Sequence, residues 1–171
     1  MANKDAAFGM KPVRMIGGAP YSGGSSRYRI AANYGTSIFQ GDMVAQVTGG
    51  TVEVHADGGT VPIVGVFNGS DIIAFIIDDP NVVYEVQADD TFPVADLFGN
   101  FDIVYTSAGS TLTGISGAEL DVTTGATATT LPIKAIDISQ DPNNDDVASA
   151  NTNVLVVIQN SVFGVKGAGL A

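Results

Sequence analysis

His55 is the only histidine and the first residue to consider for catalysis. A Ser-His-Asp site would have to use it, yet the chain has no Gly-x-Ser-x-Gly segment to hold a nucleophilic serine. His55 ends an alternating run beside a glycine turn, so we expect an ordinary surface or edge histidine. Cysteine is absent, which excludes thiol nucleophiles, disulfides and Cys-based metal sites. No Gly-Lys-Ser or Gly-Lys-Thr indicates a phosphate-binding loop. We therefore expect no enzymatic activity and no cofactor.

Paired carboxylates occur at Asp78-Asp79, Asp89-Asp90 and Asp145-Asp146. Each pair lies in or beside a predicted turn, where aspartate binds nearby backbone N–H groups. Turn formation is therefore the expected role of these pairs. A glycosidase pair assembled in three dimensions stays open at this stage, although the chain has no tryptophan to offer a sugar platform.

Asp141, Asn143 and Asp145 have the spacing of the first half of a calcium-binding loop. The sixth position is Asp146 rather than glycine, the twelfth is Thr152 rather than glutamate, and no flanking helices are predicted. We expect a solvated loop, and keep these three residues as the calcium candidate.

The composition predicts short strands joined by tight turns. The chain has 171 residues with 21 glycines and 7 prolines, and valine and threonine are abundant. Apolar residues make up 45%, enough for a core, while charged residues make up only 15%. That low charge suggests that a partner covers part of the surface. No apolar run reaches the length of a signal peptide or a membrane span, so we expect a soluble protein made in the cytoplasm.

Charge is divided unevenly along the chain. Residues 1–30 carry five basic side chains and one acid, a formal charge of +4, whereas residues 31–171 carry two basic and 17 acidic side chains, a formal charge of −15. This asymmetry predicts two surfaces with different partners. Nucleic acid is not expected among them, because the basic residues are dispersed and the acidic body repels phosphate.

Residues 1–26 are predicted to form an extended N-terminal arm. They contain many glycines and prolines, which exclude a helix or a long strand. They also contain apolar side chains that a flexible linker does not need. The arm is therefore expected to become ordered against another surface, unless it is a mobile, solvated tail.

Residues 27–171 are predicted to form one β-barrel or β-sandwich domain. Turn signals recur about every 8–12 residues, and Asn68-Gly69 is a strong hairpin signal. Ile72–Ile77 has the continuous apolar pattern of a strand buried on both faces, whereas Val82–Gln87 alternates as if one face were wet. The expected strands are 28–31, 43–47, 51–55, 61–67, 72–77, 82–87, 101–106, 119–123, 131–139 and 154–158, with one helical turn at 94–98.

Several segments together resemble small structural proteins of tailed bacteriophages. Each segment is a modest turn-strand pattern, and the resemblance rests on their order across most of the chain. The segments are Met10–Arg14, Phe39–Val44, Gly65–Gly69, Asp79–Asp89, Ser110–Ser116, Leu120-Asp121 and Val154–Asn160.

The resemblance is to capsid decoration (cement) proteins, which lie outside the icosahedral shell and bridge neighbouring capsid subunits. It implies a β-barrel or β-sandwich body, an extended arm, no catalytic residues and the major capsid protein as partner, on the outer capsid surface of the virion. A homo-oligomer, trimer or dimer, is compatible with that role. Members of this group tend to carry a longer loop after the segment ending at Gly69. Either a tight hairpin replaces it here, or a loop is missing from the sequence.

The arm and the first strand supply the candidate shell contacts: Phe8, Met10 and Met15 as apolar anchors, and Lys11, Arg14, Arg27 and Arg29 as partners for carboxylates. Two alternatives remain. One is another virion component, such as a head-tail connector or tail protein. The other is a carbohydrate- or calcium-binding β-sandwich module.

Overall fold

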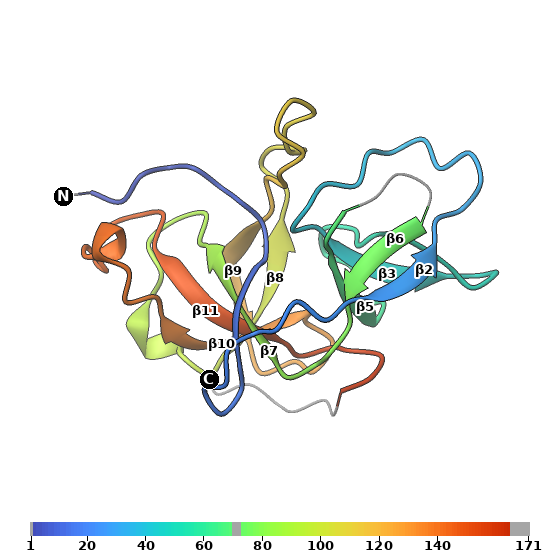
Figure 1. The fold of residues 1–171 in the computed structure, drawn as a ribbon. Coiled ribbons are helices and arrows are strands. Elements are labelled where there is room, and N and C mark those ends of the chain that lie inside the picture. Colours follow the sequence, from blue (N-terminus) through green and yellow to red (C-terminus); the bar gives the residue numbers. More distant parts are fainter. Residues whose placement is uncertain (1, 70–72, 165–171) are drawn as a thin grey trace.

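The computed structural model describes residues 2–69 and 73–164. Within these residues, eleven strands form two antiparallel sheets (Figure 1). The only helical elements of that part of the chain are two short 3-10 helices, η1 (Val94–Asp96) and η2 (Pro142–Asn144). No helix among the described residues is long and apolar enough to cross a membrane. The predicted all-β class is therefore confirmed.

The larger sheet has six strands in the order β1-β7-β11-β10-β8-β9. Its neighbours along this order are all antiparallel. The bounds are β1 Lys11–Met15, β7 Val82–Gln87, β8 Asn100–Val104, β9 Glu119–Ala126, β10 Ile133–Ile138 and β11 Asn153–Ile158.

The smaller sheet has five strands in the order β2-β6-β5-β3-β4, again all antiparallel. The bounds are β2 Ser26–Arg29, β3 Met43–Val47, β4 Thr51–Val54, β5 Ile63–Phe67 and β6 Ile73–Ile77. The N-terminal residues run along the larger sheet as β1 and then cross to the smaller sheet as β2, so they connect the two sheets (Figure 1).

Neither sheet forms a closed barrel in the described part of the chain. Isolated bridges join Ile30 to Val52 near the two edges of the smaller sheet, and Ala88 to Leu120 across the larger one. Each is a single bridge rather than a ladder of paired residues. The barrel form of the expected fold is therefore not found.

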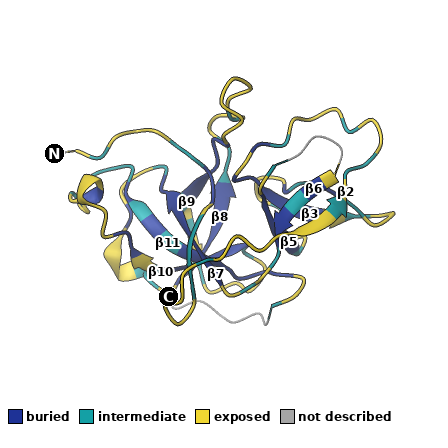
Figure 2. Ribbon diagram, viewed as in Figure 1, coloured by how far each residue is buried: buried dark blue, intermediate teal, exposed yellow. Residues whose placement is uncertain are grey.

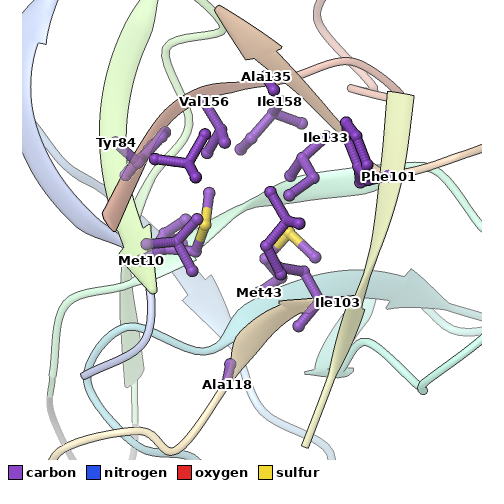
Figure 3. Packing of buried hydrophobic residues seen from close by; sticks show 14 of the residues in the cluster. Met10, Met43, Tyr84, Phe101, Ile103, Ala118, Ile133, Ala135, Val156 and Ile158 are labelled. Carbon is purple, nitrogen blue, oxygen red and sulfur yellow. The ribbon is translucent and has the colours of Figure 1, made fainter. Parts of the chain in front are cut away.

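The two sheets share one hydrophobic core. Met43, Val66 and Ile77 of the smaller sheet lie in the same buried cluster as the inner residues of the larger sheet. Figure 3 shows Met43 among residues such as Ile103 and Ile133 of the larger sheet. The alternate residues Val44 and Phe67 belong to a second cluster on the other face of the smaller sheet. Strand β5 and the first three residues of β3 are therefore buried on both faces, which explains their continuous apolar sequences.

Strand β7 corrects one expectation. The alternating sequence Val82–Gln87 predicts one solvated face, but all six residues are buried. The polar face is covered because residues before β1 contact Gln87, and because Glu85 is bound by Lys11 of the neighbouring strand β1 and by the Ser139 hydroxyl. The alternation of apolar and polar residues correctly predicted two chemically different faces of β7. It did not predict that other residues of the chain cover the polar face.

Most predicted strands are confirmed to within two or three residues at either end. Strands β3 and β7 have the predicted bounds, and the helical turn expected at 94–98 is η1. Strands β5 and β6 form the expected antiparallel pair, with the Phe75 N–H donating to the Gly69 carbonyl at 3.2 Å. Residues 70–72, where the question of a missing loop falls, lie outside the described residues.

Candidate functional site: the N-terminal segment and strand β2

The first described residues lie on the body. The Asn3 side chain donates to the carbonyl of Asp146 at 3.1 Å. The Ala6 N–H donates to Gln87 Oε1, and Gln87 Nε2 donates to the Lys4 carbonyl, each at 2.9 Å. The extended N-terminal arm predicted for residues 1–26, which was expected to become ordered against another surface, is therefore not confirmed. We use "N-terminal segment" for residues 2–15, which lie along β7.

Two of the predicted apolar anchors differ in exposure. Met10 is 1% exposed, lies in the shared core, and its N–H donates to the Gly41 carbonyl at 2.9 Å (Figure 3). Phe8 is half-buried and lines a groove of about 210 Å³ together with Met10, Val66 and Ile115. Met10 is thus occupied inside the body, and Phe8 remains accessible in part.

Strand β1 holds three more predicted site residues. The Lys11 ammonium lies 3.1 Å from Glu85 Oε2 and 5.9 Å from the centre of the Phe8 ring. Arg14 is half-buried beside a β-bulge, and Met15 packs against the shared core. Lys11 therefore has an intramolecular partner, and its ion pair ties β1 to β7.

Strand β2 places Arg27 and Arg29 on one exposed face. They are two residues apart, so their side chains point to the same side of the strand. Arg27 lies opposite Phe75 of β6 with its guanidinium 5.3 Å from the ring centre, and Arg29 lies opposite Ile73, which is 41% exposed. These four residues form the β2 patch, which combines two cations with apolar surface. Figure 2 shows exposed residues along β2.

The inner face of β2 is fixed by Tyr28. Its side chain packs against the second hydrophobic cluster, and its hydroxyl donates to Asp78 Oδ2 at 2.7 Å. Desolvation, followed by this hydrogen bond, raises the pKa of Tyr28 to about 12. Since Tyr28 is anchored, the two arginines are held facing outward.

His55 corrects another expectation. It is 2% exposed rather than on the surface, and its Nε2 has no hydrogen-bond partner. Its ring packs against Gly59, where an added Cβ would come within 2.9 Å of His55 Cε1. Burial lowers the pKa of His55. An imidazole enclosed in this way cannot reach a substrate in solution, so the ring fills space beneath the turn.

The calcium candidate forms a local turn. Asp141 precedes η2, and its Oδ1 accepts hydrogen bonds from the Asn143 backbone N–H at 2.8 Å and side-chain amide at 2.9 Å. These bonds lower the pKa of Asp141. No three His, Asp or Glu side chains in the described residues are grouped to hold a metal ion. The Asp-x-Asn spacing is thus explained by turn capping.

Sequence reasoning missed the contribution of β6 to the β2 patch. Ile72–Ile77 was expected to be buried on both faces, but Ile73 is exposed and Phe75 is half-buried. No local signal marks these two residues, because their exposure depends on which parts of the folded chain cover that face of β6.

Comparisons with protein-family models, curated proteins and solved structures find no match to this chain.

Proposed function

We propose that this protein is a structural component of a tailed-phage virion that binds the outside of the capsid, contacts the major capsid protein and bridges neighbouring subunits. The sequence resemblance supplies the class of protein. The two sheets with a shared core suit the sandwich form of the body that this resemblance implies. The observation that carries the proposal is the β2 patch, a cationic and apolar surface on a chain with a net charge of −11.

The patch has the chemistry to recognise an acidic shell surface. Phe75 supports Arg27 by a cation–π contact, and a stacked guanidinium still presents N–H donors at its edge. Arg29 supplies a second set of donors on the same face. Ile73 adds apolar area that a partner can cover. Each such contact is weak, but many copies on one particle act together.

We choose the proposed contact residues by their exposure and their intramolecular partners. We propose Arg27 and Arg29 as the main contacts, with Phe8, Arg14 and Met15 as peripheral ones. Met10 and Lys11 keep the N-terminal segment on the body instead. The role that we propose is not catalytic. The burial of His55, the single histidine, supports this part of the proposal.

The test is binding of the purified protein to empty, undecorated shells of a phage that carries this gene, measured by co-sedimentation and electron microscopy. The Arg27→Ala/Arg29→Ala variant should bind at least about tenfold more weakly, a change of about 1.4 kcal/mol. The matched control is Thr127→Asp/Thr129→Asp, which changes the net charge equally in an exposed loop after β9 and should bind normally.

Electron microscopy distinguishes capsid decoration from the alternative role as a head-tail connector. Decoration requires copies distributed over the whole shell. Density at one vertex only would instead indicate a head-tail connector, and equal binding by both double variants would remove the β2 patch from the proposal.

A further inference from the structure

The N-terminal segment is bound to the body as a peptide ligand is bound in a groove. The side-chain amide of Gln87 binds the backbone of the N-terminal segment at two points. Its Nε2 donates to the Lys4 carbonyl and its Oε1 accepts from the Ala6 N–H, both at 2.9 Å. One side chain thus pairs with the carbonyl and the N–H on alternate residues of an extended chain. This geometry recognises extended backbone in the way that an added strand is recognised.

Side chains of the segment enter separate sites along the groove. The Asn3 amide donates to the Asp146 carbonyl, and its backbone N–H donates to Ser149 Oγ at 3.4 Å. Met10 fills a position in the shared core. Between them, Gly9 has φ +68° and lies so close to Ser116 that an added Cβ would be 2.6 Å from the Ser116 Cβ. The groove therefore fits this particular sequence.

The connection from the segment to β2 is mostly exposed, and it is held at Ile16, whose N–H donates to the Asn81 carbonyl at 2.7 Å, and at Tyr21, which packs against the shared core. Residues 16–27 are all exposed except Tyr21, which is partly buried. Gly17 and Gly18 form the turn after β1, with φ of +95° and +89°, and an added Cβ would meet nothing within 4 Å at either position. The ten residues between β1 and β2 can span about 33 Å when extended. The hinge is thus long enough to let the segment reach a neighbouring molecule.

We propose that the groove along β7 also accepts residues 2–15 of a second copy of this chain, so that neighbouring copies exchange their N-terminal segments. The occupant is identified by the groove itself, which is lined to fit this sequence. Every contact of the closed form is repeated in the exchanged form, so the two differ mainly in chain entropy. The exchange does not depend on binding to a shell.

The protein concentration determines how much of the chain is in the closed form and how much is in the exchanged form. A short flexible connection gives its own segment an effective concentration on the order of 1 mM. At about 10 μM, roughly 1% of the segments are therefore exchanged, and at about 1 mM roughly half are. Copies held side by side on any surface would experience the higher value.

The absence of cysteine permits a direct test on the full chain. Lys11 and Glu85 are opposite residues of β1 and β7, and their side chains already meet. Two variants, Lys11→Cys and Glu85→Cys, are unfolded together, refolded at about 1 mM and oxidised. Because each chain carries one thiol, a mixed disulfide at this position forms only when the segment of one copy lies on the other.

The control pairs Lys11→Cys with Thr129→Cys, which lies on an exposed loop far from β1 in the sheet order. The proposal expects the mixed Lys11→Cys/Glu85→Cys product to exceed the control several-fold at about 1 mM, and to fall to the control level at about 10 μM. Equal yields for the two pairs at the higher concentration would overturn it.

A second measurement needs no substitution, in case Glu85→Cys does not fold. Equal amounts of ¹³C-labelled and unlabelled protein are refolded together at high concentration, and the dimer is isolated. Isotope-filtered NMR should then detect contacts between the Met10 methyl group of one chain and core protons of the other. A dimer that lacks such contacts, or a protein that stays monomeric, refutes the exchange.

Discussion

Replacing Met10 by alanine tests whether the N-terminal segment is part of the body. Met10 is 1% exposed and lies among residues from both sheets (Figure 3). Truncating a fully buried methionine to alanine costs about 2–5 kcal/mol, because transfer free energy is lost and a cavity remains. An exposed anchor waiting for a partner would instead change the free energy of unfolding by less than about 0.5 kcal/mol.

The assay is urea unfolding followed by circular dichroism. With a loss of about 3 kcal/mol and an m-value of about 2 kcal/mol per molar, the midpoint should fall by about 1.5 M. The matched control is Leu112→Ala, at a position that is 94% exposed, and it should leave the midpoint almost unchanged. If the Met10 and Leu112 variants unfold at the same urea concentration, the segment does not lie in the core and the reasoning fails.

Three further predictions follow from the titrating groups. Because the pKa of Tyr28 is raised to about 12, the stability that this residue contributes is complete below its ordinary pKa of about 10 and is lost as the pH rises from there through 12. Since Tyr21, Tyr84 and Tyr105 also have raised pKa values, the titration is followed by NMR of the Tyr28 ring, and Asp78→Asn should make that ring titrate earlier. The ring of His55 should titrate below its ordinary pKa of about 6.5 in NMR spectra, since burial disfavours the charged form, and stability should weaken as the pH falls below that value; a ring that titrates normally would show that the site is open to water. Because Asp141 is bonded to Asn143, the unfolding temperature should be the same in calcium and in EDTA, and a calcium-dependent rise would restore the metal hypothesis.

The strand positions were predictable because they depend on local sequence. Alternation of apolar and polar residues marks a strand wherever the chain lies, and Gly, Asp and Asn mark the turns between strands. Strands such as Met43–Val47 and Val82–Gln87 therefore have the predicted bounds. The basic character of residues 1–30 is likewise a property of the sequence alone.

Burial depended on contacts between distant residues. Gln87 is covered because residues 4–6 lie against it, more than 80 positions away in the chain. Met10 is enclosed because residues of both sheets pack around it, and His55 is enclosed where its ring packs against Gly59 in the following turn. Neither contact can be read from the pattern along one strand. The same holds for the β2 patch, where Phe75 supports Arg27 only through the pairing of β2 with β6.

The sequence alone determined an acidic, cysteine-free chain of short strands with a basic, glycine-rich beginning. Only the tertiary structure decided that this beginning lies along β7, with Met10 in the core and Arg27 and Arg29 facing outward. The physical reason is that strand periodicity and turn formation depend on residues close together in the sequence. The strand that pairs with an edge strand depends instead on how the whole molecule packs.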